Sequence, residues 1–459
     1  NSNFTSNYSE WEQTLLMKQL TIKNCTLVNE GSLLERDVLI KNGRIEKIEA
    51  SIDGEGDFID AKGLYLLPGF IDDQVHFREP GLTERGNIQT ESIAAVAGGT
   101  TSFMDMPNVI PPTLNLELWN EKIKIAAQVS LANYSFYMGS SNTNIEDIKS
   151  IDASEVCGLK VFMGSSTGNL LVDDQKALED IFNYSPVIIT THCEDTPLIN
   201  ENEKKAHEKY GEDIPIELHE EIRSREACLI STKKAIELAR QFNAKLHVLH
   251  ISTRDEIELF KAGPVEEKLI TAEVCVPHLL FSSEDYKSLG SLIKCNPSIK
   301  SNTDKQALRQ ALKDQTIDYV ATDHAPHILS EKKNTYSTAP SGMPSVQHSL
   351  LAVLEMVHEG DLELTEVPRI TSHSVAKRFD IKERGFIREG FWADLVLVNM
   401  NDSYEVKKEK ILYKCGWSPF ESYTFKSRII ETIVNGERVY SQGKILSDTI
   451  GKKLEFTRG

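Results

Sequence analysis

Long apolar runs and basic runs are both missing from this sequence. No stretch approaches the roughly 20 consecutive apolar residues of a membrane-spanning helix. Acidic residues outnumber basic ones, 69 Asp and Glu against 51 Lys and Arg, which gives a formal net charge of −18. Because nucleic acids and anionic membranes attract basic surfaces, we expect neither as a partner. A small anionic substrate remains compatible with this charge, since one local arginine can outweigh a distant, diffuse charge.

Cysteine is sparse and follows no pattern. The chain has seven cysteines, an odd number, at scattered positions and without a Cys-x-x-Cys pair. Neither a disulfide framework nor a thiolate zinc site is indicated, and a reducing cytoplasm is the simplest expectation. Glycine-rich phosphate-binding and dinucleotide-binding motifs are missing as well.

The first sixteen residues, 1–16, are polar and lack both the basic start and the apolar core of a secretory signal. Met17 resembles a natural start, so residues 1–16 are expected to be an upstream extension or a cloning remnant. The fold prediction therefore begins at residue 17.

Hydrophobic patterning divides the chain into two β-rich ends and an α/β middle. Short strand-like runs with turns occupy about residues 20–67 and return in Asp394–Val398 and Ile430–Val434. The middle alternates apolar runs with helical patterns, which is typical of βαβ units. Its eight apolar runs are Leu64–Ile71, Thr100–Met104, Tyr134–Tyr137, Gly158–Phe162, Val187–Thr191, Leu246–Leu249, Leu269–Val274 and Ile317–Thr322.

This order of elements predicts an α/β fold, a (β/α)8 TIM barrel with a small β-sandwich domain built by both ends of the chain. We expect the first part of the sandwich at residues 17–67. A metal-dependent catalytic barrel would span residues 68–383, and the second part of the sandwich would span residues 384–459.

Unusual polar residues follow the carboxyl ends of the predicted strands. The first run leads into Asp72, Gln74 and His76, whose alternating positions would place their side chains on one face of a strand. The later strand ends carry Asp105, Asn108, Lys160, His192, His250 and Asp323. In such barrels this rim carries the chemistry, so we expect these side chains to gather there.

Three histidines on three different strand ends are candidate metal ligands. Any one of His76, His192 and His250 alone would more often be structural, but three on one rim favour a zinc-like ion. Asp323 can ligate such an ion and can accept a proton from an activated water. The alternative role for Asp323, a helix N-cap, is weakened by the Ala-Pro pair that follows. His247, away from the strand end, is expected to be structural.

Lys160 lies in an apolar run, where a buried ammonium is costly unless it loses its proton or gains a partner. A neutral lysine can react with CO2 to form a carbamate, an anionic group that can bridge two metals. An ion pair with a nearby carboxylate is an equally good interpretation of the run itself. The candidate ligands around Lys160 favour the carbamate.

Residues for substrate recognition are also present. Arg78 follows His76 by two positions, and its guanidinium could bind a carboxylate with two parallel hydrogen bonds. Asn108 and Asn296 can recognise amide or carboxylate groups, although Asn beside Pro is more often turn chemistry. The segment Ala339–Pro344 is rich in Pro and Gly and is either a substrate-covering loop or a linker.

Jointly, these motifs resemble the dihydroorotases of the amidohydrolase superfamily, over about residues 20–440. The resemblance implies reversible hydrolysis of the cyclic amide of (S)-dihydroorotate to N-carbamoyl-L-aspartate in de novo pyrimidine biosynthesis. It also implies a homodimer with one or two zinc ions per chain. The segments that carry it are His76–Gly81, Asp105–Asn108, His250–Thr253, Asn296–Pro297, Asp323–His327, Pro340–Pro344 and Lys414–Phe420.

The resemblance also implies a role for each site residue. The metal ligands would be His76, N-carboxylated Lys160, His192, His250 and Asp323. Asp323 would be the catalytic residue and would pass a proton from the attacking water to the departing amide nitrogen. The substrate-binding residues would be Arg78, Asn108, Asn296 and His327.

Two positions depart from the family pattern. Gln74 stands where the family has a metal-ligating histidine, and an amide oxygen is a far poorer zinc donor than an imidazole. The first metal position should therefore be weakened, which would leave an ion held mainly by His192, His250 and Lys160. Val276-Pro277-His278 stands where the family has Pro-His-His, and the role of His278 is open.

Two other functions remain possible on these residues. Gln74 motivates an inactive dihydroorotase-like subunit that scaffolds aspartate transcarbamoylase, although such a scaffold has no chemical need for the retained His and Asp residues. A hydantoinase-like or allantoinase-like enzyme would hydrolyse another cyclic amide, but Arg78 and Asn108 favour an anionic substrate.

Overall fold

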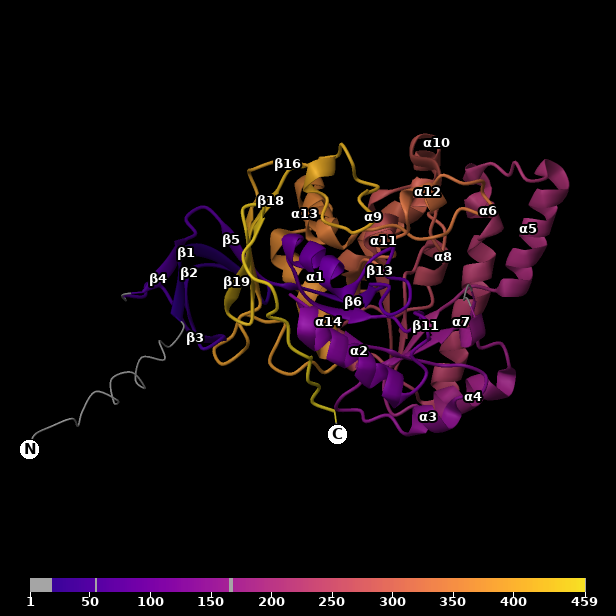
Figure 1. Ribbon diagram of the computed structural model, residues 1–459, viewed down its shortest axis with the longest axis horizontal. Helices are drawn as coiled ribbons and strands as arrows, with labels where there is room; N and C mark the ends of the chain where they lie inside the picture. Colours follow the sequence, from indigo (N-terminus) through magenta and orange to yellow (C-terminus); the bar gives the residue numbers. More distant parts are fainter. Residues whose placement is uncertain (1–18, 54–55, 165–167, 459) are drawn as a thin grey trace, which may run out of the picture.

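A ring of parallel strands lies at the centre of the molecule (Figure 1). The structure, a computed structural model, describes residues 19–53, 56–164 and 168–458, so the predictions for residues 1–16 and for a start at Met17 lie outside it. The ring closes where Val75 bridges His324 and the His76 N–H donates to the His324 carbonyl over 2.7 Å. In chain order the ring consists of β6 (Phe70–Val75), β7 (Thr100–Asp105), β8 (Asn133–Phe136) continued by β9 (Met138–Gly139), β10 (Leu159–Phe162), β11 (Ile189–His192), β12 (Leu246–Val248), β13 (Ile270–Cys275) and β14 (Tyr319–Ala321).

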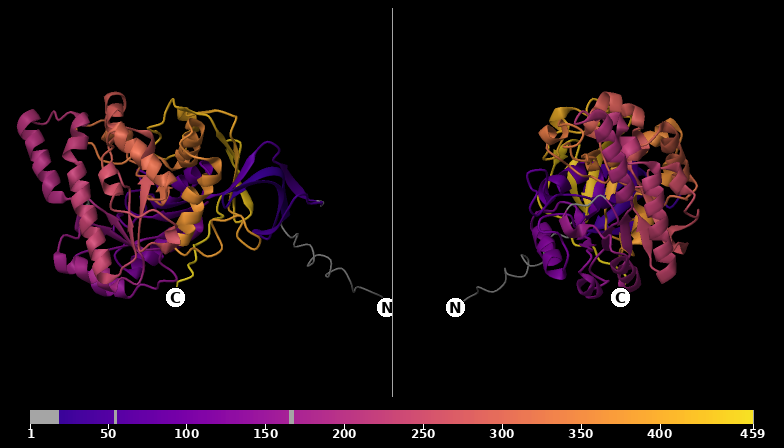
Figure 2. Two further views of the ribbon diagram at one scale, coloured as in Figure 1. Left: turned by 180° about the vertical axis from the view of Figure 1, so that it is seen from behind. Right: turned by 90° about the vertical axis from the view of Figure 1, so that its right-hand side faces the viewer.

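Helices cover the outside of the ring (Figures 1 and 2). Several begin at a side chain that caps the first turn: Asn87 accepts from the Thr90 N–H, and Ser224 accepts from the Ala227 N–H. The helices are α1 (Ile88–Ala97), α2 (Leu116–Val129), α3 (Ile145–Lys149), α4 (Gln175–Tyr184), α5 (Thr196–Tyr210), α6 (His219–Ile222), α7 (Arg225–Phe242), α8 (Arg254–Ile257), α9 (Val276–Leu280), α10 (Tyr286–Leu289), α11 (Asn302–Lys313), α12 (Leu329–Lys332), α13 (Ser349–Glu359) and α14 (Ser374–Arg378).

Apolar side chains fill the end of the ring away from the predicted active site. Ile71, Met104, Leu249 and Tyr319 form one buried cluster with Phe379, which follows α14. Because Met104 of β7 and Leu249, which directly follows β12, lie on opposite sides of the ring, the cluster extends across its interior. The ring is therefore a packed core and not a pore.

A nine-stranded sheet built from both ends of the chain forms the second part of the molecule (Figure 2). Apolar side chains from the two chain ends, such as Ile22, Val38, Leu395 and Ile433, pack into one core. The predicted fold, a (β/α)8 barrel with a small β-sandwich domain, is confirmed. The sheet consists of β1 (Gln19–Asn29), β2 (Ser32–Lys41), β3 (Arg44–Glu49), β4 (Asp57–Asp60), β5 (Tyr65–Pro68), β15 (Leu395–Asn399), β18 (Arg428–Val434), β19 (Glu437–Ser441) and β20 (Lys444–Ile445).

The run predicted as the first barrel strand, Leu64–Ile71, is in fact split between the two sheets. β5 ends at Pro68 and pairs with β1 and β15, whereas β6 starts at Phe70 in the ring. Gly69 joins them so close to β7 that a Cβ at this position would lie 2.1 Å from the Thr101 hydroxyl oxygen. One apolar run therefore serves two sheets, which periodicity alone does not reveal.

Residues 384–459 were expected to form the second part of the sandwich. Two segments within this range lie outside the nine-stranded sheet. The first segment contains the short pair β16 (Tyr404–Glu405) and β17 (Thr424–Phe425), and its Trp417 indole donates to the His327 carbonyl over 2.8 Å. The second is the last stretch of the chain, where Leu454 is buried and its N–H donates to the Tyr134 carbonyl of β8. Both segments pack on the barrel.

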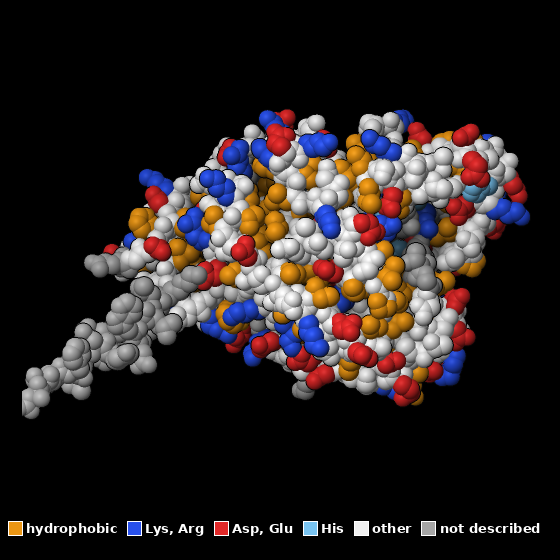
Figure 3. Space-filling view, in the orientation of Figure 1, with side chains coloured by type: hydrophobic (Ala, Val, Ile, Leu, Met, Phe, Trp, Pro, Cys, Tyr) orange, Lys and Arg blue, Asp and Glu red, His pale blue; other side chains and the backbone are white. Residues whose placement is uncertain are grey.

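The surface seen in Figure 3 carries acidic and basic side chains interspersed, without a continuous basic stripe on that face. Within the described ranges, no helix has both the length and the apolar composition needed to cross a bilayer.

Candidate active site

A cavity of about 370 Å³ opens at the carboxyl ends of the ring strands. It is lined by all nine residues predicted for the site, although they come from positions up to 251 residues apart. The nine are His76, Arg78, Asn108, Lys160, His192, His250, Asn296, Asp323 and His327. Gln74 lines the cavity as well, as do Pro340, Ser341 and Gly342 of the predicted substrate-covering loop. The structure thus brings the predicted residues together, while their individual roles remain predictions.

The expectation that Asp72 would share a face with Gln74 and His76 is wrong. The pairing of β6 with β7 shifts register between Asp72 and Val75, so the simple alternation is interrupted. The Asp72 carboxylate accepts hydrogen bonds from the Thr322 hydroxyl at 2.6 Å and from the Thr322 N–H at 3.2 Å, and it does not line the cavity. Asp72 therefore fastens β6 to the segment that carries Asp323.

Two imidazoles face each other at the floor of the cavity. His192 Nδ1 lies 2.9 Å from His250 Nε2, while His192 Nε2 lies 2.8 Å from a carboxylate oxygen of Glu194. Burial lowers the pKa of both histidines, which keeps them neutral. A carboxylate behind a ligating histidine fixes its ring and tautomer, and Glu194 is itself paired with Arg223.

Lys160 lies in β10 beside this pair. Its side chain is buried, and its ammonium lies 4.6 Å from the centre of the Phe162 ring. Among the described residues, no carboxylate forms an ion pair with Lys160, which removes support from the ion-pair alternative. Burial lowers the pKa of Lys160 to about 8, so part of the population carries the neutral amine that a carbamate requires.

The donor set of His192, His250 and Lys160 fits a zinc ion. Two nitrogens bound to one tetrahedral zinc at about 2.0–2.1 Å would lie about 3.3 Å apart. The observed separation of 2.9 Å between His192 Nδ1 and His250 Nε2 differs from this value by a small adjustment of two side chains. A carbamate on Lys160 would add an anionic oxygen donor.

Asp323, His76 and Asn108 form a hydrogen-bonded chain on the opposite wall. His76 Nε2 lies 3.0 Å from Asp323 Oδ1, and His76 Nδ1 lies 2.8 Å from Asn108 Oδ1. Burial alone would raise the pKa of Asp323, but the hydrogen bond to His76, together with the positive charge of Lys160, lowers it to about 2. Asn108 thus orients His76 through its oxygen, and its amide nitrogen faces no competing contact with His76.

Arg78 and His327 lie together at a third side of the cavity. Arg78 Nε donates to the Pro326 carbonyl at 3.1 Å, and Arg78 Nη2 lies 3.1 Å from His327 Nε2. Burial, followed by the charge of Arg78, holds the pKa of His327 far below its usual value, so its imidazole is neutral. A buried guanidinium without a carboxylate partner in the described chain is suited to receive an anion.

Three cavity residues adopt left-handed backbone conformations. The φ angles are 69° at Arg78, 38° at His250 and 49° at Asp323. Such conformations cost about 1–3 kcal/mol each for residues other than glycine and cluster at functional sites. Sequence periodicity could not indicate them, because none of the three is glycine or asparagine.

Gln74 and His278, the two departures from the family pattern, have different surroundings. The Gln74 side-chain oxygen lies 3.5 Å from the Cys275 thiol, which donates to it. His278 does not line the cavity; its Nε2 lies 3.0 Å from the Pro297 carbonyl, beside Asn296. Burial lowers the pKa of His278 to about 4, so it is a neutral residue that anchors the Asn296 segment.

Asp105, which we expected on the rim of the active site, does not line the cavity and instead holds neighbouring segments together. One carboxylate oxygen accepts from the Phe77 N–H at 2.7 Å, and the other pairs with the buried Lys122 at 2.5 Å. This ion pair fixes the backbone between His76 and Arg78. The signal for it in the sequence was Lys122, a charged residue on the inward face of α2.

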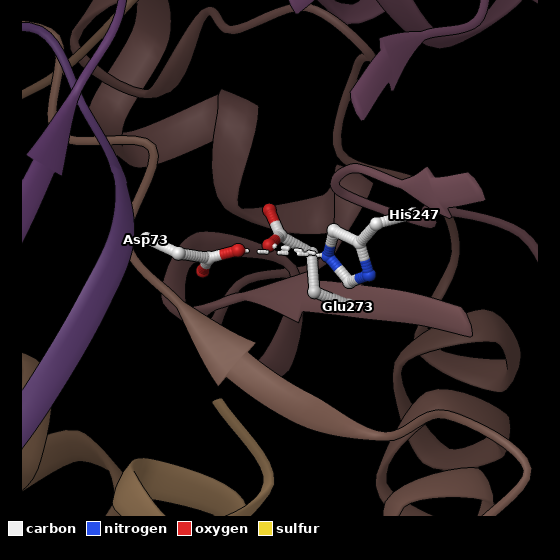
Figure 4. A group of neighbouring side chains, drawn as sticks. All are labelled: Asp73, His247 and Glu273. Atoms are coloured by element: carbon white, nitrogen blue, oxygen red, sulfur yellow. Dashed lines mark hydrogen bonds and ion pairs between the residues drawn. The ribbon is translucent and has the colours of Figure 1, made fainter. Parts of the chain in front are cut away.

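A second polar cluster, which the sequence reasoning missed, lies in the barrel interior (Figure 4). His247 Nε2 lies 2.9 Å from Glu273 and 3.6 Å from Asp73, and Tyr319 donates to Asp73 at 3.0 Å. The ligand atoms of Asp73, His247 and Glu273 lie within 4.8 Å of one another, close enough to hold a metal ion. The available signal was Glu273, inside the apolar run Leu269–Val274, and Asp73, in the polar stretch that follows the run Leu64–Ile71.

A family model described as "Amidohydrolase family" matches residues 65–439, a range that contains the whole cavity. The chain belongs to the amidohydrolase family. The predicted membership is thereby confirmed, and with it the expectation of a hydrolase.

Individual amidohydrolases resemble the chain over nearly its full length. A dihydroorotase of Methanosarcina acetivorans is 32% identical over 419 residues, which cover 88% of this chain and 88% of that protein. An allantoinase of Bacillus velezensis is 31% identical and covers 92% of this chain and 94% of its own. The solved structure of an L-hydantoinase (dihydropyrimidinase) from Arthrobacter aurescens superposes with a TM-score of 0.89 at 25% identity, covering 95% of this chain and 99% of its own.

Proposed function

We propose that this chain is a zinc-dependent dihydroorotase, which reversibly hydrolyses the cyclic amide of (S)-dihydroorotate to N-carbamoyl-L-aspartate in de novo pyrimidine biosynthesis. The observation that carries the proposal is the buried guanidinium of Arg78 in the same cavity as the imidazoles of His192 and His250. The imidazoles suit metal-assisted amide hydrolysis, and the guanidinium suits a substrate that bears a carboxylate. The similarity to an archaeal dihydroorotase supports the same function.

His192, His250 and N-carboxylated Lys160 would hold the principal zinc ion. When bound, zinc polarises the ring carbonyl and activates the attacking water. His76 and Asp323 would complete a second metal position. Because Gln74 replaces an imidazole there, and its oxygen is engaged by Cys275, we propose that the second position binds its ion more weakly.

Asp323 would move the proton. Its depressed pKa leaves it ionised at neutral pH, so a carboxylate oxygen is free to accept the proton of the attacking water. When the second position holds no ion, His76 Nε2, 3.0 Å from Asp323 Oδ1, would orient this carboxylate. The protonated carboxyl then donates to the departing amide nitrogen. Nothing else in the described cavity offers a carboxylate for this task.

Arg78 would bind the substrate carboxylate and thereby orient the ring. Its Nε is anchored to the Pro326 carbonyl and its Nη2 is close to His327, so the guanidinium plane is fixed before substrate arrives. The amide groups of Asn296 and Asn108 lie in the same cavity and would complete the contacts with the ring.

We further propose a homodimer in the cytoplasm. All seven cysteines are free thiols, six of them buried, which suits a reducing compartment. The dimer is an expectation from the family resemblance alone.

Two alternatives share part of this chemistry. An allantoinase-like or hydantoinase-like activity is favoured by the similarity to those relatives, but it leaves the buried Arg78 without a carboxylate to bind. A catalytically inactive scaffold for aspartate transcarbamoylase is favoured by Gln74, but it leaves the ordered chain of Asn108, His76 and Asp323 without a purpose.

The test is to measure zinc per chain and ring opening of dihydroorotate, allantoin and hydantoin on one purified sample. We expect bound zinc and turnover of dihydroorotate only. Arg78→Met should keep its zinc and lose at least about 100-fold in kcat/KM for dihydroorotate, because a charge-assisted pair is removed. Zinc with turnover of a neutral cyclic amide would establish the second function, and a chain with neither zinc nor turnover would establish the scaffold.

A further inference from the structure

Two buried lysines fasten the loop that walls the cavity, and neither has been given a role above. Lys332, at the end of α12, is fully buried, and its ammonium donates to three backbone carbonyls: Lys294 at 3.1 Å, Pro340 at 2.8 Å and Gly342 at 2.7 Å. Lys294 donates to the carbonyls of Tyr336 at 2.6 Å and Ala339 at 2.7 Å. The two ammonium groups thus join the Asn296 segment, α12 and the loop.

The carbonyl cage selects the charged form of Lys332. An ammonium has three N–H donors and no acceptor, which matches three carbonyl oxygens. A neutral amine would have two donors and would turn its lone pair toward the third oxygen. Burial lowers the pKa of Lys332 to about 7, so a substantial part of the population keeps the ammonium at neutral pH, and within the described chain no carboxylate lies within ion-pair distance to compensate that charge. Glu331, the adjacent acid, pairs with Arg85 at 3.1 Å.

Lys332 also determines which polar groups the loop presents. Pro340 and Gly342 line the cavity, whereas Lys332 does not, so their carbonyl oxygens are drawn toward the interior of the protein. In a trans peptide the C=O and the N–H of one unit point in opposite directions. The N–H of Ser341, which follows Pro340 and lines the cavity, therefore points away from Lys332. The carbonyl oxygens of Pro340 and Gly342 point to Lys332 and not into the cavity, so they do not repel a carboxylate that enters it.

We propose that Lys332 is a positioning residue for anionic substrate: it withdraws the carbonyls of Pro340 and Gly342 from the cavity wall and places an uncompensated positive charge behind that wall. The inference rests on the proposed function, since it assumes a substrate with a carboxylate. Lys332 touches no substrate; it acts through the loop and through its charge. His327 Nε2 lies 3.0 Å from the Ser341 carbonyl and 3.1 Å from Arg78 Nη2, so this imidazole lies between the same loop and Arg78.

The test compares two ligands that differ only in a carboxylate, orotate and uracil. Their dissociation constants are measured by calorimetry on the zinc-loaded full chain, for the unchanged protein and for Lys332→Met. We expect orotate binding to weaken at least 10-fold and uracil binding to change less than 3-fold. In catalysis, KM for dihydroorotate should rise while kcat changes by less than about 3-fold.

Lys294→Met is the matched control, because it also removes a buried ammonium from two loop carbonyls, but neither Tyr336 nor Ala339 lines the cavity. It should alter the binding of both ligands by the same factor. If Lys332→Met does not fold, Lys332→Gln, which retains two donors without charge, takes its place with the same expected selectivity loss.

An unchanged ratio of orotate to uracil affinity in the folded variant overturns the proposal, as does failure of both Lys332 variants to fold, which would assign Lys332 a structural role only. These results differ from failure of the proposed function. Dihydroorotate turnover by the unchanged protein with an unaltered affinity ratio rejects Lys332 alone, whereas a zinc-loaded protein that cannot open dihydroorotate rejects the function.

Discussion

At the scale of single residues, the cavity separates groups by protonation state. The buried imidazoles of His192 and His250 are neutral and suited to metal, Asp323 is ionised, and Lys160 lies closest to losing its proton near neutral pH. The physical cause differs for each group. Desolvation dominates for the histidines and the lysine, while at Asp323 desolvation is outweighed by the hydrogen bond to His76 together with the positive charge nearby, including that of Lys160.

Gln74→His tests the account of the weakened metal position. An imidazole in the cavity would replace an amide oxygen that is engaged by the Cys275 thiol. We expect zinc per chain, measured by atomic emission after dialysis against a fixed free-zinc buffer, to rise toward two. His192→Ala, which removes a proposed ligand of the principal ion, is the opposite control and should lower the zinc content. An unchanged zinc content in Gln74→His would contradict our account of this position.

Asp323→Ala tests the proton transfer. Loss of a positioned acid–base group typically costs about 10²–10⁴-fold in rate, so kcat for dihydroorotate should fall by at least that range. The ion held by His192, His250 and Lys160 should remain, and zinc analysis of the same sample provides the control. Retention of full turnover would exclude Asp323 as the proton carrier.

At the scale of elements, the loop from Tyr336 to Met343 is the part of the cavity wall whose shape depends most on backbone contacts. Gly342 has a φ of +128°, and a Cβ at this position would lie 2.7 Å from the Ala325 carbonyl oxygen. Its N–H donates to the Lys294 carbonyl at 2.9 Å. The loop therefore has little room for a side chain at position 342. Such a side chain would press on Ala325, which is two residues from Asp323.

Gly342→Ala should shift the loop and impair the site. We expect a loss of about 1–3 kcal/mol in the free energy of unfolding, from strain at positive φ. We also expect a rise in KM for dihydroorotate. Gly360→Ala is the matched control: it has a φ of +84° with nothing within 4 Å of the added Cβ, at the end of α13. The control should lose stability with unchanged kinetics; equal KM values in the two variants would show that the loop is not part of the site.

At the scale of the whole molecule, the barrel interior contains two polar layers next to the apolar cluster of Ile71, Met104, Leu249, Tyr319 and Phe379. The upper layer is the cavity, and the lower layer is the cluster of Asp73, His247 and Glu273 with Tyr319 (Figure 4). The lower layer supports the upper one, because Glu273 also accepts a hydrogen bond from the His250 N–H at 3.4 Å. Two buried carboxylates side by side are tolerated when they share a proton or hold a cation.

Asp73→Asn tests how the lower layer contributes to stability. Burial raises the pKa of Asp73 to about 6, so the folded state holds a proton that the unfolded chain releases near pH 4. The stabilisation from Asp73 is therefore complete below about pH 4 and is lost as pH rises through about 6.

The stability advantage of the unchanged protein over Asp73→Asn should fall by on the order of 1–3 kcal/mol between pH 4 and pH 7. Urea unfolding of both proteins in the presence of a chelator measures it. If the free energies of unfolding of the two proteins changed with pH in parallel, Asp73 would have the same pKa in the folded and the unfolded state. A larger advantage without chelator than with it would indicate that the lower layer holds an ion.

The sequence by itself determined the barrel, the two-ended sandwich and the membership of the cavity. Parallel strands present their carboxyl ends at one edge, so His76, His192, His250 and Asp323 had to meet once eight alternating runs were recognised. Local periodicity contains that information for these four residues, but it also placed Asp72 and Asp105 with them, and the substrate-binding roles of Asn296 and His327 came from the family resemblance.

Only the tertiary structure decided the contacts between segments far apart in the chain. The shifted register that turned Asp72 toward Thr322, the hydrogen bond from His76 to Asn108 and the carbonyl cage around Lys332 each depend on elements brought together by packing. A pattern along the chain indicates which face of a strand or helix a residue occupies. It does not indicate which residue, distant in sequence, that side chain contacts. Buried polar groups in folded proteins form hydrogen bonds, and their partners come from segments that only the complete fold brings together.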